Sequence, residues 1–343
     1  MYTYELQKAT DILVKDVCAV KKGETVVLTG DSLSCMPVIN AVASSVYAAG
    51  GLPMIITFPA PDGVGQAADP KLPIEPLTAA VSNCDVWIEF NQKWLLYSTP
   101  YQRAISENKK LRYLCLVEFT EDVLIRTLCD IDTSKLRTFM EAVAVRNREA
   151  KEIHMTTPAG TDVTFLTDPQ HVVSVDAGDA SKSGVYMMLG QLNVVPKFGS
   201  VNGTIVFDGT VTPPFGKSPA EPIRLTVKDS VIVKIEGGSE AAEYEKWLKN
   251  FNDPGMLKMA HVAYGFNPGA KLSGNVVEDE RVWGATEWGI GYVSPTVGGP
   301  DGQAAVSHTD GLCMNSSVWL DGKQIMNEGK IVDPELAKLY EHK

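Results

Sequence analysis

The apolar pattern of the chain changes near residue 150, and this change limits the folds that it can adopt. Before that point, short runs rich in Val, Ile and Leu alternate with segments that repeat small and apolar residues at helical spacing. Strands separated by helices in this way favour a parallel sheet covered by helices on both faces. The predicted strands cover residues 23–31, 53–59, 85–91 and 111–119, and the predicted helices cover residues 37–51, 74–84, 101–110 and 120–129.

A long helix over residues 134–157, ending before the turn at Pro158, is predicted to carry the chain into its second half. From there, short alternating strands are joined by Gly and Asp turns, which is typical of antiparallel sheets. The fold class is therefore α/β plus α+β. We expect a parallel-sheet α/β domain over residues 1–150, and a mainly antiparallel β domain with the metal site over residues 151–343.

Charge and composition exclude several classes of partner. The net charge of −11 argues against nucleic acid or an anionic membrane surface, because both carry negative charge themselves. No apolar run is long enough to span a bilayer, and the first residues lack the pattern of a signal peptide. The six cysteines are scattered without a paired spacing, as expected for reduced thiols. These features predict a cytoplasmic protein.

Two histidines and an aspartate are the candidates for a metal site. His261 lies in the segment MAHVAYGFNP, where small and apolar residues predict a half-buried place on a strand. His308 and Asp310 are two residues apart in VSHTDG, and side chains at that spacing on an extended segment share a face. Two imidazoles and a carboxylate suit a divalent transition metal. A lone half-buried histidine is more often a core residue, so the prediction depends on the gap between His261 and His308 closing in the fold.

Four other polar side chains could act beside such a metal. Glu287, in the glycine-rich segment GATEWGIG, could be a fourth oxygen ligand or a general base, and its structural alternative is a pair with Arg281 or a lysine. Gln191 and Asn193 could hydrogen-bond a ligand, although both could equally be turn residues. Ser307 is a further candidate for orienting a substrate.

At these residues the sequence resembles the aminopeptidase T-like metalloenzyme superfamily and, within it, the branch of 2,5-dihydroxypyridine 5,6-dioxygenase. The resemblance covers most of the chain and is strongest from Thr157 onward. The segments that carry it are TPAGTDVTF, GSVNGTIVFDG, IEGG, NFNDP, GFNPGAKL, HTD and DGKQIM.

The resemblance also separates the two branches. The peptidases hold two metal ions with two glutamates, a histidine and a final H-x-D pair. Gln191 and His261 stand where the glutamates are expected, and Glu287 stands where the histidine is expected. Only His308 and Asp310 keep the peptidase identity. Because a glutamine carries no charge to balance a second cation, the resemblance implies one metal ion rather than two.

The dioxygenase pattern has FNDP, then H-I-G-x-G, and a closing H-x-D pair, which match His261, His308 and Asp310. The resemblance implies that these three residues hold a mononuclear Fe(II) cofactor. The loop between the ligands departs from both relatives, so we expect it to decide which substrate is accepted.

The sequence therefore predicts a non-haem Fe(II) ring-cleaving dioxygenase that acts on a hydroxylated pyridine or similar small aromatic with O2. Glu287 is the expected general base, and Gln191, Asn193 and Ser307 are expected to orient the substrate. The alternatives are a metal-dependent aminopeptidase or other hydrolase, and a non-catalytic protein whose metal site has decayed. The resemblance also implies a homo-oligomer.

Overall fold

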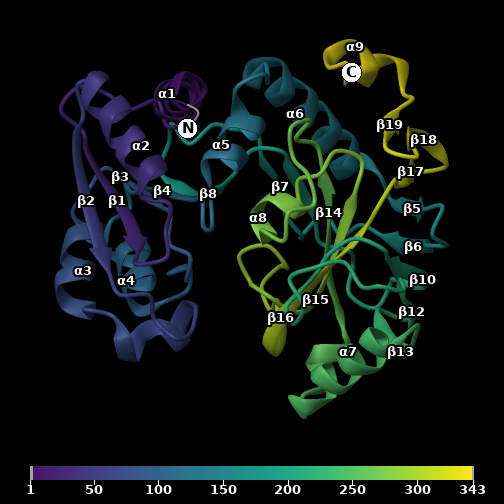
Figure 1. Ribbon diagram of the computed structural model, residues 1–343. Coiled ribbons are helices and arrows are strands. Elements are labelled where there is room, and N and C mark those ends of the chain that lie inside the picture. The colour runs from purple at the N-terminus through teal and green to yellow at the C-terminus, as the bar shows by residue number, and fades with distance from the viewer. Residues whose placement is uncertain (1–2, 342–343) are drawn as a thin grey trace. The chain divides into compact units, whose positions relative to one another are not determined.

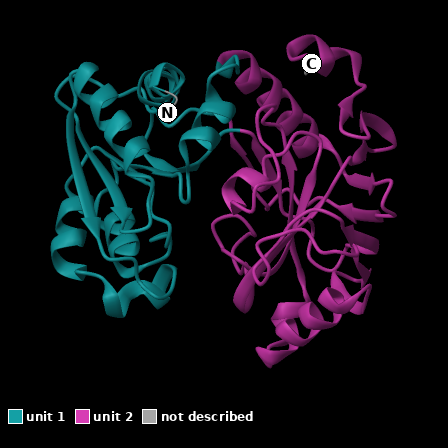
Figure 2. Cartoon of the chain, in the orientation of Figure 1, with its two compact units in different colours: residues 1–133, 178–189 teal, residues 134–177, 190–343 magenta. Residues whose placement is uncertain are grey.

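The computed structural model describes residues 3–341, which fall into two compact units (Figure 2). Unit 1 contains residues 1–133 and 178–189, and unit 2 contains residues 134–177 and 190–343. The chain therefore leaves unit 1, returns to it for one short segment, and then completes unit 2.

The division differs from the predicted boundary at residue 150, because helix α6 (Thr133–Glu149) lies almost wholly in unit 2. Its buried face explains this placement. Tyr264 donates a hydrogen bond of 2.9 Å from its hydroxyl to the Asn147 side chain near the end of the helix. The helix is thus a packed part of the second unit rather than a link that precedes it.

Unit 1 is built on a parallel sheet of five strands in the order β2–β1–β3–β4–β8 (Figure 1). The strands are β1 (Thr25–Asp31), β2 (Leu52–Phe58), β3 (Val86–Glu89), β4 (Arg112–Cys115) and β8 (Gly184–Met187). The helical segments are α1 (Thr3–Ile12), η1 (Leu13–Val17), α2 (Met36–Ala48), η2 (Gly65–Lys71), α3 (Ile74–Ser82), α4 (Thr99–Glu107) and α5 (Glu121–Leu128). The predicted α/β class is confirmed.

Local sequence explains where several of these elements begin. The side chains of Ser98 and Thr120 accept hydrogen bonds from backbone N–H groups of the first turns of α4 and α5. Strand β8 was not predicted, because it has only four residues, all at least partly exposed, and its place in the sheet depends on pairing with β4, which is distant in sequence.

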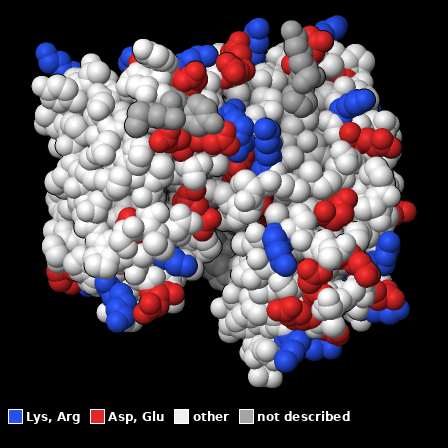
Figure 3. Space-filling view, viewed as in Figure 1, with Lys and Arg blue, Asp and Glu red and all other residues white. Residues whose placement is uncertain are grey.

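Strand β2 forms one edge of this sheet and is unusual for its exposure. Its sequence, LPMIITF, is typical of a strand covered on both faces, yet Leu52, Met54 and Ile55 are exposed. Figure 3 shows a largely uncharged area over this part of unit 1, at the left of the view. Apolar sheet edges are where chains associate. The predicted homo-oligomer stays a prediction.

Unit 2 contains two antiparallel sheets. The eight-stranded sheet has the order β13–β12–β10–β6–β5–β17–β18–β19, and the six-stranded sheet has the order β11–β16–β15–β14–β9–β7. The strands of the first are β5 (Glu152–Thr156), β6 (Asp162–Leu166), β10 (Asn202–Phe207), β12 (Ile223–Lys228), β13 (Val231–Glu236), β17 (Ser317–Leu320), β18 (Lys323–Asn327) and β19 (Lys330–Ile331). Those of the second are β7 (Val173–Asp176), β9 (Gln191–Val194), β11 (Val211–Thr212), β14 (Met259–Gly265), β15 (Thr286–Val293) and β16 (Gln303–Cys313). The helical segments besides α6 are α7 (Ser239–Asn250), η3 (Pro254–Leu257), α8 (Val276–Asp279) and α9 (Pro334–Leu339).

The helix predicted over residues 134–157 is too long, since α6 ends at Glu149 and β5 follows almost at once. The segment EIHMT alternates exposed or half-buried residues with buried ones, and it pairs with β6 on one side and β17 on the other. Pairing across the sheet thus overrides the helical reading of the sequence.

The two sheets of unit 2 pack against each other through large side chains. Trp288 on β15 meets Phe165 on β6 edge to face, with ring centroids 5.7 Å apart. Gly311 on β16 leaves room for the ring of Phe207 on β10. One face of the six-stranded sheet is therefore core, and the opposite face remains for the candidate site.

None of the helices between residues 3 and 341 is long and apolar enough to cross a membrane.

Candidate metal centre

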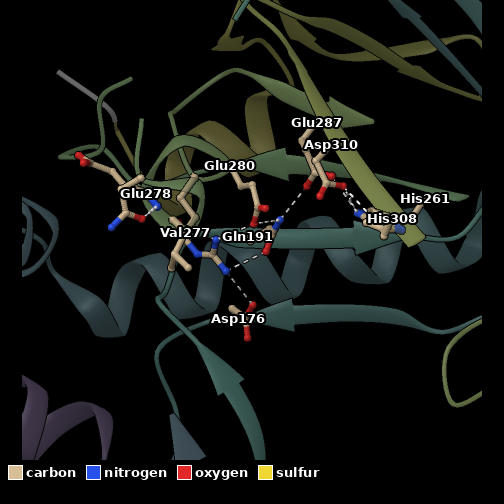
Figure 4. A network of polar contacts seen from close by, with 11 residues as sticks. Asp176, Gln191, His261, Val277, Glu278, Glu280, Glu287, His308 and Asp310 are labelled. Carbon is tan, nitrogen blue, oxygen red and sulfur yellow. Dashed lines mark hydrogen bonds and ion pairs between the residues drawn. The ribbon is translucent and has the colours of Figure 1, made fainter. Parts of the chain in front are cut away.

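His261, His308 and Asp310 come together on one face of the six-stranded sheet (Figure 4). Each offers one ligand atom, and these atoms all lie within 4.8 Å of one another. The Asp310 Oδ1 atom lies 2.9 Å from His308 Nε2 and 3.9 Å from His261 Nε2. The long gap in sequence closes because β15 pairs with both β14 and β16.

Gly289 on β15 lies between His261 on β14 and His308 on β16, and its lack of a side chain leaves space for both imidazole rings. The rings are parallel to within 2°, with centroids 5.1 Å apart. A Cβ atom at residue 289 would lie 2.4 Å from Cε1 and Nδ1 of His261 and 2.9 Å from Cε1 of His308. Any side chain there would have to displace both rings.

Two irregularities in strand pairing flank this glycine. The β14–β15 register shifts between Met259 and Val262, where His261 lies. The β15–β16 register shifts again between Gly291 and Val293, just beyond the pair Gly291–His308. β-bulges of this kind turn a side chain away from its regular direction and are common beside active sites.

The orientation of His308 is set by a backbone carbonyl. Its Nδ1 lies 2.9 Å from the Tyr292 carbonyl oxygen, so Nδ1–H is the donor and Nε2 faces Asp310. Two acceptors at 2.9 Å repel each other unless a proton or a cation lies between them. Burial opposes the charged ring, but the Asp310 carboxylate prevails and raises the pKa of His308. A metal ion can take the place of that proton.

Glu287 lies beside His261 and is buried, with only 1% of its side chain exposed. Its Oε1 lies 2.9 Å from His261 Nε2, which is an ion-pair distance when the ring is protonated, and no other hydrogen-bond donor among residues 3–341 reaches this oxygen. Burial raises the pKa of Glu287, His261 opposes this rise, and Asp310 adds to it. Although burial would lower the pKa of His261, Glu287 and Asp310 raise it to about 9.

Gln191 holds the other oxygen of Glu287. Its amide nitrogen donates to Glu287 Oε2 at 2.9 Å and to Glu280 Oε2 at 3.1 Å. Its amide oxygen accepts from Arg281 Nη2 at 2.8 Å, and an arginine can only donate. Arg281 therefore fixes which end of the amide faces the carboxylates. The donors predicted to orient a substrate are thus engaged by Glu280 and Glu287.

Arg281 is fully buried, and its charge is balanced inside the unit. It donates to Glu280 at 3.0 Å and to Asp176 on β7 at 3.3 Å. The sequence analysis left open a direct pair between Arg281 and Glu287. In the structure, Gln191 lies between them and bonds to both. The network was missed because a run of charges such as EDER is typical of a solvated turn. A buried position is visible only in the fold.

The remaining two candidates differ in their placement. Asn193 on β9 lies opposite Ala263, which lies opposite Glu287, so Asn193 shares the face of the site. Ser307 directly precedes His308 on β16, and adjacent side chains on a strand point to opposite faces. The structure therefore brings Asn193, but not Ser307, to this face.

The donor set fits a divalent transition metal. Two imidazole nitrogens and a carboxylate oxygen lie within reach of one point, and the Tyr292 backbone carbonyl orients the ring of His308. Glu287 Oε1, which is buried and lies 2.9 Å from His261 Nε2, adds a further carboxyl oxygen at the same place. These residues could hold one metal ion.

Comparison with known proteins places the chain in a family. A family model described as 2,5-dihydroxypyridine 5,6-dioxygenase matches residues 12–333. The chain belongs to this family. The 2,5-dihydroxypyridine 5,6-dioxygenase of Pseudomonas putida KT2440 is 27% identical over 256 residues, which is 71% of either chain. Membership of this dioxygenase family supports an enzyme that acts as a dioxygenase.

Solved structures agree with the predicted fold. The 2,5-dihydroxypyridine dioxygenase from Pseudomonas putida KT2440 superposes with a TM-score of 0.79 at 22% identity, covering 98% of this chain and 99% of that one. Wild-type AmpT from Thermus thermophilus superposes with a TM-score of 0.68 at 14% identity, covering 97% of this chain and all of AmpT. The family branch and the fold class predicted from the sequence are confirmed.

Proposed function

We propose that this member of the 2,5-dihydroxypyridine 5,6-dioxygenase family is a mononuclear non-haem Fe(II) enzyme that cleaves the ring of 2,5-dihydroxypyridine or a similar hydroxylated pyridine, using O2. The observation that carries the proposal is the convergence of His261, His308 and Asp310 on one face of a sheet. The names of the family and of its Pseudomonas relative support the substrate class.

His261, His308 and Asp310 would hold the metal through two imidazole nitrogens and a carboxylate oxygen. When bound, Fe(II) supplies a Lewis acid and a source of electrons, which together allow an electron-rich aromatic to react with O2. The protein keeps these ligands ready in advance. The Tyr292 carbonyl holds the ring of His308, and Gly289 leaves the space that both rings need.

Glu287 would act as the general base that takes a proton from a substrate hydroxyl. Its Oε2 is occupied by the Gln191 amide, so Oε1 is the atom that can receive the proton. Burial raises the pKa of this carboxyl, which brings a carboxylate closer to the working range of a base at neutral pH. Gln191 and Arg281 would keep the carboxylate in position. Asn193, on the same face, remains a candidate for a contact with the substrate.

The alternative from the same superfamily is a metal-dependent aminopeptidase or other hydrolase with one or two ions. The resemblance of the whole fold to AmpT supports it only at the level of the fold. The environment of Gln191 disfavours a second ion. Its amide N–H groups point at Glu280 and Glu287, so a cation between these carboxylates would face hydrogen-bond donors.

One preparation can separate these proposals. The purified chain is loaded with Fe(II) without oxygen, and its iron content is measured before O2 uptake is followed with 2,5-dihydroxypyridine. We expect about one iron per chain and one O2 consumed per ring cleaved. Zinc-loaded and cobalt-loaded samples with peptide substrates are the control. If the chain binds two ions, hydrolyses peptides and takes up no oxygen, the dioxygenase proposal is wrong and the hydrolase proposal is supported.

A further inference from the structure

We propose that the hydroxyl of Thr212 is a further specificity residue, which donates a hydrogen bond to an acceptor atom on the heteroaromatic substrate. This inference rests on the proposed function. Neither the sequence pattern nor the metal-binding motif pointed to this residue, which ends the two-residue strand β11.

The register of the sheet places Thr212 beside the candidate metal centre. Thr212 lies directly opposite Asp310, and Val211 lies opposite Gly311. Directly paired residues of antiparallel strands project to the same face, with Cβ atoms roughly 5 Å apart. Thr212 therefore shares the face of Asp310, while Val211 is fully buried.

The backbone that carries Thr212 is held firmly. Thr309, on the core face of β16, donates its hydroxyl hydrogen to the carbonyl oxygen of Pro213. The buried hydroxyl of Tyr244 lies 3.3 Å from the same Thr309 hydroxyl. Threonine is also stiff at χ1, because its Cβ is branched. The position of the Thr212 side chain is therefore restricted.

That hydroxyl is buried and, within residues 3–341, lacks any hydrogen-bond partner. A buried hydroxyl without a partner is unfavourable and rare in native proteins, so a missing ligand atom is its natural partner. Glu287 Oε1 lies on the same face, at 2.9 Å from His261 Nε2. Thr212 is paired with Asp310 on one side, and Glu287 lies on β15 on the other.

The unpartnered hydroxyl of Thr212 and the proposed base Glu287 lie on either side of Asp310, which suits a ligand with two polar groups. Glu287 Oε1 can accept a proton or hydrogen bond, whereas a hydroxyl such as that of Thr212 can also donate. A hydroxypyridine offers both a hydroxyl to be deprotonated and a strong acceptor, either the ring nitrogen or the carbonyl oxygen of its pyridone form. A carbocyclic diphenol has neither a ring nitrogen nor such a carbonyl. Thr212 would thus favour nitrogen heterocycles over benzene rings.

The test measures binding separately from turnover. The zinc-loaded protein is titrated with 2,5-dihydroxypyridine and with hydroquinone without oxygen, for the wild type, Thr212→Val and Thr212→Ser. We expect Thr212→Val to weaken binding of the pyridine about tenfold, which corresponds to about 1.4 kcal/mol. Thr212→Ser should restore most of the affinity, and hydroquinone binding should change little.

Thr286→Val is the matched control. Thr286 lies on β15 on the core face, and its hydroxyl is 2.8 Å from that of Ser316. Its loss should lower the melting temperature and leave pyridine affinity unchanged. Thr212→Val should leave the melting temperature unchanged and weaken the affinity for the pyridine, because it removes a hydroxyl that has no protein partner.

Three outcomes would overturn the proposal. Equal pyridine affinity for the wild type and Thr212→Val would remove Thr212 from recognition while leaving the dioxygenase intact. If Thr212→Val loses its metal, the hydroxyl supports the metal ligand Asp310 and does not bind the substrate. A wild type that neither binds nor cleaves any hydroxypyridine would overturn the proposed function, and this inference with it.

Discussion

The amide nitrogen of Gln191 donates a 2.9 Å hydrogen bond to Glu287 Oε2, and Arg281 on the opposite end of the amide determines that it does so. A residue that looked like a substrate ligand is therefore a support for the proposed base. The pair also explains why an uncharged residue is useful here. A carboxylate at residue 191 would face both Glu280 and Glu287.

Gln191→Glu should make the proposed base harder to ionise. The added carboxylate removes two donors and brings a like charge, and both effects raise the pKa of Glu287. The acidic limb of the pH profile of kcat/KM should move to higher pH, and turnover at pH 7 should fall about tenfold. Gln191→Met is the control, since it removes the donors without adding charge and should shift the profile less. An unchanged profile in Gln191→Glu would show that the residue does not act through Glu287.

Glu287→Gln should retain iron and lose turnover. The amide has nearly the same shape but cannot accept the substrate proton, and loss of a general base costs about 100-fold or more in rate. Iron content and kcat are measured on the same preparation. If iron disappears together with activity, Glu287 is a metal ligand rather than a base.

Gly289→Ala should empty the metal centre while leaving the fold in place. The new methyl group would lie 2.4 Å from the ring of His261, so both imidazoles would have to move. We expect iron content to fall at least tenfold, as for loss of a ligand or its orienting partner, with little change in the circular dichroism spectrum. Gly23→Ala is the control, because a Cβ there meets nothing within 4 Å, although its φ of +84° makes the change destabilising by about 1–2 kcal/mol. Normal iron binding by Gly289→Ala would show that the rings can adapt.

Glu89→Gln should change how the stability of the chain depends on pH. Burial raises the pKa of Glu89 to about 7 from 4.5, although hydrogen bonds from Tyr113 and Leu95 oppose the rise. A carboxyl with a raised folded-state pKa contributes stability that is complete below pH 4.5 and is lost as the pH rises through about 7. The wild type should therefore lose stability relative to Glu89→Gln over that interval, by roughly 1.4 kcal/mol per pH unit where the effect is steepest. Urea unfolding at several pH values measures the difference, and parallel curves would contradict the assignment.

The fold class was predicted from the sequence, and the three candidate ligands that it named lie together, but their surroundings were not predicted. We could identify His261, His308 and Asp310 as candidates from the sequence, because residue type, spacing and family resemblance agreed. The hydrogen bonds of Arg281 to Gln191 and Asp176 join positions 90 and 105 residues apart, and no local pattern encodes them. The same reason explains why the pairing of β8 with β4 was missed.

Polar residues without a partner were also invisible to sequence reasoning. Thr212 has no motif around it, and its importance comes from a register that sets it opposite Asp310. Ser307 shows the converse case. It is adjacent to His308 in the chain, but alternation along β16 directs it to the other face. Proximity in sequence was a poor guide to proximity in the site.

The shift in register between Gly291 and Val293 gives this site a particular freedom to evolve. The pairs Gly289–Asp310 and Gly291–His308 lie on one side of the shift, and the loop that joins β15 to β16 lies beyond it. Residues added to or removed from that loop would fall outside the paired segment that carries His308 and Asp310, so these ligands would keep their register. Relatives could therefore acquire new substrates by exchanging the loop without having to rebuild the metal centre.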